Sequence, residues 1–290
     1  MIAGVLLLVG GAAAGLFGSL LGLGGGVLIV PLLTLGFGRP LREAVAVSLV
    51  CVIVTSSAAA GAYLRSRTAN LRLGMVLVLF TAVGALAGAL VAFSLPDRVL
   101  AGLFALLLVY VALSMARGLR SRPTTAPDAR REPVPVAGEP VDDGAPAGDE
   151  PPALAGVLGG ALDGPGYHVR RLGPGGLASL GAGVVAALFG VGGGIVNVPT
   201  MHLVMGAPLR VAAATSNLMM GVTAVSSAII YMLRGGLDPY LAAPTALGVF
   251  VGASVGARVA HRVDVRVIRG LFVVVLAWTA FQMARRAFGL

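Results

Sequence analysis

Two glycine triplets, each followed five residues later by a proline, are the part of this chain best suited to hold a ligand. They are Gly24, Gly25 and Gly26 with Pro31, and Gly192, Gly193 and Gly194 with Pro199. Because glycine has no Cβ, its backbone N–H group can approach a ligand closely, and a helix that starts there adds partial positive charge. The pattern therefore favours anion binding, although close helix packing is a second use of such glycines.

Polar side chains near these glycines are the next candidates, because an unpartnered amide or hydroxyl in hydrocarbon costs several kcal/mol. They fall within apolar segments at Ser48, Thr55, Asn197, Thr215, Ser216 and Asn217. Serine and threonine also bond the carbonyl of the preceding turn, so the two asparagines are the stronger candidates. Arg42 and Arg210, at matching positions, would attract anions or anchor the chain at the membrane interface.

Other chemistries lack their residues. The chain has no lysine and no nucleotide-binding loop, and Val27 and Ile195 occupy the last glycine position of a dinucleotide fingerprint. His202 with Ser216 is a weak signal for an intramembrane protease, without the accompanying motif. No carboxylate falls in the middle of an apolar run, so proton relays and cation sites lack their ligands. We expect neither an enzyme, nor a metal, nor a cofactor.

The composition indicates an integral membrane protein. Its 290 residues are 57% hydrophobic and 11% charged, with a mean hydropathy of +0.95, whereas a soluble domain has about 25% charged residues. Most of its apolar runs reach the roughly 20 residues that an α-helix needs to cross the bilayer. They span about 4–36, 44–64, 73–95, 99–116, 176–205, 211–233, 240–257 and 267–284. The sequence predicts an all-α polytopic membrane protein.

The excess of basic over acidic residues does not indicate a nucleic-acid partner. The net charge of +9 comes from arginines alone, and these lie in short loops between apolar runs with no accompanying motif. The single cysteine, Cys51, lies inside an apolar run and is expected to be a small buried hydrophobe. The first residues have no basic segment before the apolar run, so we expect no cleaved signal peptide.

An internal repeat organises the chain. Shifting residues 15–119 by 168 positions aligns them without a gap on residues 183–287, with about 37% identity. The segment between is rich in proline, glycine and acidic residues and cannot build a core. We predict a first transmembrane repeat at 1–119, a disordered linker at 120–174 and a second repeat at 175–290.

Each repeat begins with a run too long for one crossing. Residues 4–36 as a single helix would extend about 50 Å, against a hydrocarbon core of about 30 Å. The glycine triplet and the proline are the natural break, so the run either breaks within one crossing or folds back as a hairpin. Folding back gives three crossings per repeat and divides the arginines 15 to 6 between the two sides, against 13 to 8 otherwise. The positive-inside rule favours hairpins and inverted repeats.

The paired Gly-x-Gly-Gly-Gly-x-x-x-x-Pro elements at 22–31 and 190–199, with Ser48, Thr215 and Ser216 after them and Gly-x-x-x-Gly at 84–88 and 252–256, resemble the TauE/SafE sulfite exporter family. The resemblance covers both repeats, and the linker is longer than the family pattern. It implies a multi-pass carrier of the bacterial or archaeal inner membrane that exports sulfite, sulfoacetate or related organosulfonates. It also centres the substrate region on the two glycine triplets and their prolines, with Ser48 and Ser216 nearby.

The sequence therefore predicts a transporter of small sulfur oxyanions or organosulfonates that works by alternating access. Its expected partners are a small anionic substrate and the lipid bilayer, with a homo-oligomer also open and no nucleic acid. An anion channel, or a structural membrane protein whose glycines only serve packing, stays open as the alternative. Asn197 and Asn217 replace Ile29 and Leu49 of the first repeat, so the second repeat is expected to supply more of the polar contacts.

Overall fold

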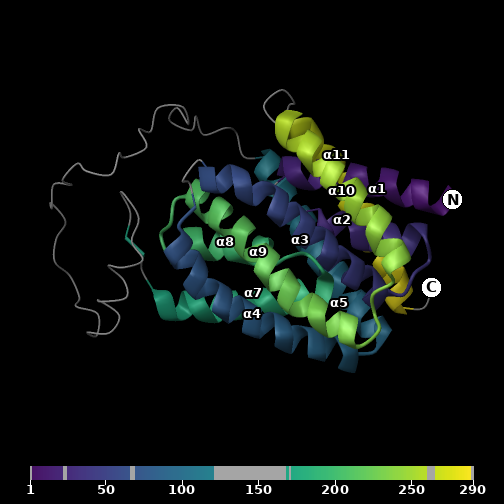
Figure 1. The fold of residues 1–290 in the computed structure, drawn as a ribbon, viewed down its shortest axis with the longest axis horizontal. Helices are drawn as coiled ribbons and strands as arrows, with labels where there is room; N and C mark the ends of the chain where they lie inside the picture. The colour runs from purple at the N-terminus through teal and green to yellow at the C-terminus, as the bar shows by residue number, and fades with distance from the viewer. Residues whose placement is uncertain are drawn as a thin grey trace.

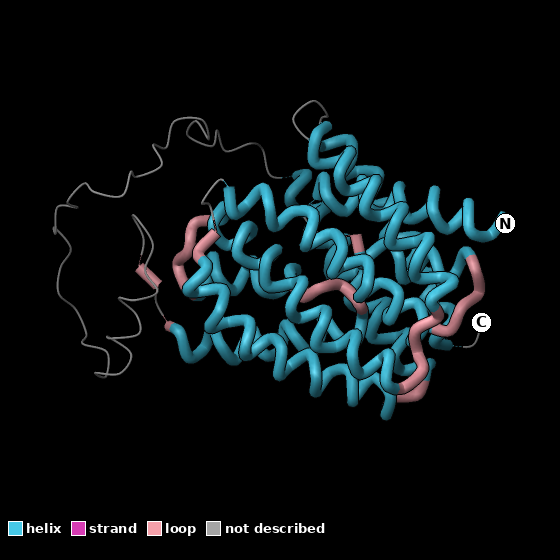
Figure 2. Tube along the Cα trace, viewed as in Figure 1, coloured by secondary structure: helices cyan, strands magenta, loops and turns pink. Residues whose placement is uncertain are grey.

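The computed structural model describes residues 2–21, 25–65, 69–120, 168–169, 171–259 and 265–288, and all regular structure in these ranges is helical (Figures 1 and 2). The first half contains α1 (Ile2–Leu21), α2 (Gly26–Pro31), the π-helix η1 (Leu32–Gly36), α3 (Leu41–Arg65), α4 (Leu71–Ser94) and α5 (Asp97–Arg120). The second half contains α7 (Leu172–Phe189), α8 (Gly194–Pro199), the π-helix η2 (Thr200–Val204), α9 (Leu209–Leu233), α10 (Pro239–Val259) and α11 (Val265–Phe288). The predicted linker falls almost wholly outside the described residues.

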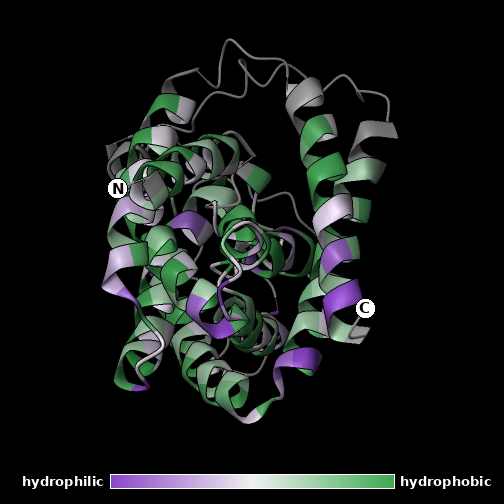
Figure 3. Cartoon of the chain, turned by 90° about the vertical axis from the view of Figure 1, so that its right-hand side faces the viewer, coloured by the Kyte–Doolittle hydropathy of each residue, from purple (hydrophilic) through white to green (hydrophobic). Residues whose placement is uncertain are grey.

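The helices have the length and surface of membrane spans, which confirms the predicted all-helical membrane protein. Six of them, α3, α4, α5, α7, α9 and α10, are long and apolar enough to cross a bilayer. Large apolar side chains point outward along the bundle: Leu79 of α4 is 68% exposed and Val274 of α11 is 66% exposed. Figure 3 shows apolar residues along most of the helix surfaces. An apolar surface this extensive needs lipid against it.

Both halves begin with a helix that breaks at the glycines and folds back. A Cβ built on Gly25 would lie 3.4 Å from the Ala14 carbonyl oxygen, while the Leu32 side chain lies against Gly10. Residues further along the returning arm therefore contact residues earlier in α1. In the second half Gly193 faces Ala182 in the same way. The arms α2–η1 and α8–η2 thus run antiparallel to α1 and α7, which makes two hairpins.

Each hairpin packs on a helix of the other half. Helix α1 lies along α10 and α7 lies along α4, while α5 packs with α11 (Figure 1). Glycines allow the backbones to meet: a Cβ on Gly84 would overlap the Leu180 carbonyl, and one on Gly252 would overlap the Ala12 carbonyl. These two glycines stand 168 positions apart and begin the two Gly-x-x-x-Gly pairs. The small residues are therefore what lets the two halves interlock.

Two ends of the bundle can be defined from contacts between loops. At end A, the loops at 37–40 and 234–238 meet through an ion pair in which Arg39 Nη2 lies 3.0 Å from Asp238 Oδ2. At end B, the backbone N–H of Asn70 donates to Thr215 Oγ1 at 2.9 Å. Helix α3 runs from end A to end B, whereas α9 runs from end B to end A. The two central helices are therefore antiparallel.

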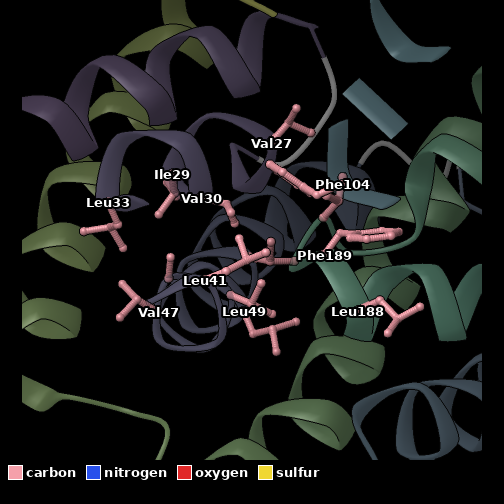
Figure 4. Packing of buried hydrophobic residues seen from close by; sticks show 14 of the residues in the cluster. Val27, Ile29, Val30, Leu33, Leu41, Val47, Leu49, Phe104, Leu188 and Phe189 are labelled. Carbon is pink, nitrogen blue, oxygen red and sulfur yellow. The ribbon is translucent and has the colours of Figure 1, made fainter. Parts of the chain in front are cut away.

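A hydrophobic core surrounds the hairpin tips. Figure 4 shows the side chains of α2 and α3 packed beside those of α5 and α7, including Val27, Ile29, Leu49, Phe104 and Phe189. The rings of Phe104 and Phe189 lie 5.7 Å apart between centroids, so α5 contacts the end of α7 across the boundary between the halves. Cys51 is fully buried here, as predicted. The described residues of the tips thus pack against an apolar core.

Candidate functional site

The tips of the two hairpins meet beside α3, and one hydroxyl joins them. Ser48 Oγ lies within hydrogen-bonding distance of the Gly190 carbonyl oxygen (2.7 Å) and of the Gly26 carbonyl oxygen (3.1 Å). Gly26 itself has no room for a side chain, because a Cβ there would overlap the Gly190 carbonyl. Ser48, a predicted substrate contact, therefore ties the first tip to the second in this structure.

Glycine is required at the first residue of each turn into the returning arm. Gly25 (φ 75°) and Gly193 (φ 74°) are the N-caps of α2 and α8 and stand at equivalent positions. Other residues adopt this left-handed conformation at a cost of about 1–2 kcal/mol. The Gly193 carbonyl accepts the N–H groups of Val196 and Asn197, at 3.1 and 3.0 Å, which starts α8. Gly192 precedes it with φ 76°, and Gly24, its counterpart, lies outside the described residues.

The prolines explain why each arm changes helix type. Pro31 and Pro199 are the last residues of α2 and α8, and a π-helix follows each at once. Proline has no N–H to donate to the residue four positions earlier, so the regular α-helical bonding is interrupted there. The wider π turn that results is often found at functional sites. Each arm is thus a short α-helix and a π turn, held by the tip glycines at one end.

Three polar side chains around α8 are buried and lack partners among the described residues. Asn197 is 1% exposed with neither amide atom bonded, and the hydroxyls of Ser179 and Ser216 are fully buried and equally unbonded. Each such group costs about 1–3 kcal/mol when nothing bonds it. Their equivalents in the first half are Ile29, Gly11 and the fully engaged Ser48. Among the described residues, the buried hydroxyl and amide groups without a bond therefore all lie around the second hairpin.

From the register of the helices we infer that these three groups lie beside one stretch of α8. A Cβ on Gly194 would lie 3.5 Å from Ser216 Oγ, which places α9 on one side of the arm. On the other side Gly193 faces Ala182 of α7. Because the arm and α7 are antiparallel, Asn197, one turn after Gly193, comes level with Ser179, one turn before Ala182. We call Ser179, Asn197 and Ser216 the orphan cluster.

The surroundings of the orphan cluster are neutral. Residues 172–199 and 211–224 contain no charged side chain. The cluster offers two hydroxyl donors and an amide N–H₂ group, together with acceptor oxygens. Among the described residues no group of three or more His, Cys, Asp or Glu side chains could hold a metal ion. Chemically, this arrangement suits the binding of a small polar species by hydrogen bonds.

Three other predicted polar residues have partners elsewhere. Thr55 Oγ1 donates to the Val52 carbonyl at 3.0 Å, and Thr215 Oγ1 accepts the N–H of Asn70. The Asn217 carbonyl accepts from Ser56 Oγ at 2.5 Å, which links α3 to α9, and the residue has a further interaction. The Thr55 bond lies within α3, whereas the other two contacts join α3 to α9 and α9 to the loop at end B. The structure therefore does not gather all the predicted polar residues into one site.

Arg42, the predicted anion-attracting arginine of the first half, is bonded to other groups at end A. Arg42 Nη2 donates to the Leu95 carbonyl at 2.6 Å, and Nε lies 3.4 Å from Asp97 Oδ1. Its guanidinium also lies 5.7 Å from the centroid of the Phe93 ring. The Arg210 side chain lies outside the described residues. Nearby, the hydrogen bond with Glu43 raises the pKa of Arg39.

Sequence comparison now identifies the chain. The profile described as Sulfite exporter TauE/SafE matches residues 7–283. The chain belongs to the TauE/SafE family. It is similar, at 26% identity over 289 residues and 96% of each chain, to the probable membrane transporter protein YunE of Bacillus subtilis (strain 168). Over 109 residues, 35% of this chain and 17% of the relative, it is 27% identical to the probable membrane transporter protein MamO of Magnetospirillum gryphiswaldense. No solved structure matches the chain.

The family member described here is thus a multi-pass membrane transporter, as the resemblance implied. One residue of its orphan cluster, Ser179, is not among the residues predicted from the sequence. It replaces Gly11 of the first half and lies in a run of glycine and apolar residues that looks like packing surface. A signal was nevertheless present, because Ser179 is the one polar side chain between residues 172 and 189.

Proposed function

We propose that this transporter exports small sulfur oxyanions or organosulfonates, such as sulfite or sulfoacetate, from the cytoplasm of a bacterium or archaeon. The orphan cluster is the observation that carries the proposal. A buried amide and two buried hydroxyls without partners destabilise the empty protein, and a bound oxyanion would satisfy them together. The family description adds the sulfur chemistry.

The donors of the cluster fit such a cargo. A sulfite or sulfonate group presents several oxygens around one sulfur atom, and each oxygen accepts hydrogen bonds from amide N–H or hydroxyl groups. Bonds to a charged oxygen are roughly twice as strong as neutral ones, and they strengthen further away from water. Buried neutral donors can therefore replace hydration without a counter-charge that would hold the cargo too tightly to release it. The glycines at the tip, Gly192, Gly193 and Gly194, keep the backbone close to the same position.

We propose that the two halves are inverted repeats, and that this arrangement lets the site open to either side of the membrane. It is supported by the antiparallel α3 and α9 and by matched helix bounds, since α2 and α8 begin 168 residues apart. In this arrangement the first hairpin enters from end A and the second from end B. End B, with 15 of the 21 arginines, would face the cytoplasm by the positive-inside rule. Rocking one half against the other would then alternate access.

Flux into proteoliposomes tests the proposal. We expect saturable sulfite or sulfoacetate flux by the unchanged protein, and a loss of at least ten-fold in Asn197→Leu, which replaces the amide with an apolar side chain of the same number of heavy atoms. The matched control is Ile29→Leu at the equivalent position, which should keep normal flux. Flux that rises linearly with concentration would indicate a channel instead. Equal flux in Asn197→Leu and Ile29→Leu would refute the site.

A further inference from the structure

An apolar groove separates the first hairpin from α11. Its volume is about 410 Å³, and its walls come from α1, the returning arm α2–η1 and one face of α11. The α11 wall is partly open to the outside, since Leu271 is 52% exposed and Trp278 is 56% exposed. The groove therefore faces the hydrocarbon of the membrane along its length.

The groove offers nothing to a polar ligand. Thr279 is the single hydroxyl in its wall, and Thr279 Oγ1 already donates to the Val275 and Leu276 carbonyls of its own helix, at 2.9 and 3.0 Å. The remaining lining residues are apolar or glycine. A hydrocarbon chain is the occupant that such a surface accommodates without leaving a polar group unbonded.

A second cavity of about 270 Å³ lies near the groove at end A: Gly38 lines it two residues after Gly36 of the groove, and Met283 lines it one turn after Thr279. It is lined by the segment after η1, by the start of α5 and by the end of α11, and it contains Arg98 and Arg286. Arg286 Nη1 donates to the Thr34 carbonyl at 3.3 Å, on the same arm that forms the groove. The acid in this cavity, Asp97, is paired with Arg42. The polar cavity thus holds two guanidinium groups directly beyond the apolar groove.

We propose that these two cavities together form a binding site for one anionic phospholipid. An acyl chain lies in the groove between the first hairpin and α11, and the phosphate lies between Arg98 and Arg286. The charge argues for an anionic lipid, because both arginines are exposed at end A, where α5 begins and α11 ends. The short separation of the groove from the arginine cavity, about one turn along α11, argues for a lipid rather than for a free anion. The lipid would fill the space beside the returning arm.

Native mass spectrometry of the detergent-purified protein tests the site, with dioleoyl phosphatidylglycerol and dioleoyl phosphatidylcholine compared at equal concentrations. We expect one phosphatidylglycerol to bind in preference to phosphatidylcholine. Arg98→Gln and Arg286→Gln should each weaken that binding about five-fold. Arg285→Gln is the matched control, since it removes the same charge from the neighbouring residue, which lines neither cavity.

A third variant tests the groove apart from the arginines. Ala13→Phe fills it from α1 at an exposed position, and should remove bound lipid while leaving the melting temperature of the protein close to normal. Equal binding of the two lipids, or equal losses in Arg285→Gln and Arg286→Gln, would overturn the proposal. So would tight binding of glycerol 3-phosphate alone, because the cavity would then be a plain anion site. Normal lipid binding by Ala13→Phe would exclude the groove.

Discussion

At the scale of residues, the two halves use equivalent positions in opposite ways. Ser48 bonds two carbonyls that come from different hairpins, whereas Ser216, its counterpart, is buried with no partner among the described residues. The same contrast holds between Ile29, which packs in the core, and Asn197, which has two unbonded amide atoms. At these two pairs of positions, the first-half residue stabilises the fold and the second-half residue keeps unbonded polar atoms.

This contrast predicts that one substitution has opposite effects at the two serines. Ser48→Ala should lower the free energy of unfolding by about 1–3 kcal/mol, because it removes the hydroxyl that donates to the buried Gly190 carbonyl, 2.7 Å away. Ser216→Ala should leave stability unchanged or raise it, because it removes a group that bonds nothing. Thermal unfolding in detergent without substrate measures both. A larger loss in Ser216→Ala than in Ser48→Ala would show that Ser216 has a structural partner.

The neutral surroundings of the orphan cluster predict that singly charged cargo, such as hydrogensulfite, is preferred over the doubly charged sulfoacetate. A second charge taken out of water without a counter-charge costs several kcal/mol. Hydrogensulfite loses its remaining proton near neutral pH, so the share of monoanion in total sulfite falls as the pH rises. We therefore expect sulfite flux to fall with rising pH, while the flux of isethionate, which stays singly charged, stays constant. Sulfite flux that rises with pH would contradict a site for monoanions.

The sequence offered candidate polar residues around the second hairpin, but it could not show which of them lack hydrogen-bond partners. Asn197 stood out because an amide is hard to satisfy within an apolar helix. Ser179 did not, because a hydroxyl can bond its own helix and only the fold shows that this one does not. Thr55 and Thr215 were predicted for the same reason as Ser216 and have partners instead. Which hydroxyls are satisfied depends on register between helices, which composition cannot reveal.

At the scale of elements, the hairpin tips depend on glycine in two ways. Gly193 has a left-handed backbone, and a Cβ there would lie 3.1 Å from the Ala182 carbonyl oxygen. Gly193→Val should therefore shift the returning arm and abolish transport. Size-exclusion chromatography and far-UV circular dichroism establish that the variant folds. Full transport by a folded Gly193→Val protein would exclude the tip from the pathway.

The contact between α4 and α7 gives a matched pair of glycine substitutions. A Cβ on Gly84 would overlap the Leu180 backbone, so Gly84→Ala should separate the helices and destabilise the protein. Gly181, on the outer side of α7, has no atom within 4 Å of its Cβ position. There Gly181→Ala should raise stability by about 0.5–1 kcal/mol, because alanine favours a helix. Equal melting temperatures for the two variants would contradict the close approach of these helices.

Element boundaries were largely predictable, because the glycine triplets and prolines are strong local signals. The break in each first run follows from glycine and proline alone, and the returning arms begin where the triplets end. The π turns after Pro31 and Pro199 were not foreseen, since they depend on how the arm is held at both ends. Nor could the sequence show that each hairpin packs on the other half, because a Gly-x-x-x-Gly pair does not indicate which helix packs against it.

At the scale of the whole molecule, the antiparallel central helices predict the membrane topology. End B carries the loop that precedes α4 and the start of α9, while the last helix, α11, ends at end A, where Arg286 reaches Thr34. A reporter inserted in the linker and one fused after Leu290 should therefore lie on opposite sides of the membrane. Signals from the same side would refute inverted repeats and leave a parallel arrangement.

Ligand-dependent stability tests the central claim most directly, because the orphan cluster should be satisfied only when cargo is bound. The melting temperature of the purified protein should rise with sulfite or sulfoacetate, and at 100 times the dissociation constant the gain is about 2.7 kcal/mol. Asn197→Leu should abolish this rise, while Ile29→Leu should keep it. A ligand-dependent rise of equal size in both variants would contradict the assignment of the substrate site to the second hairpin.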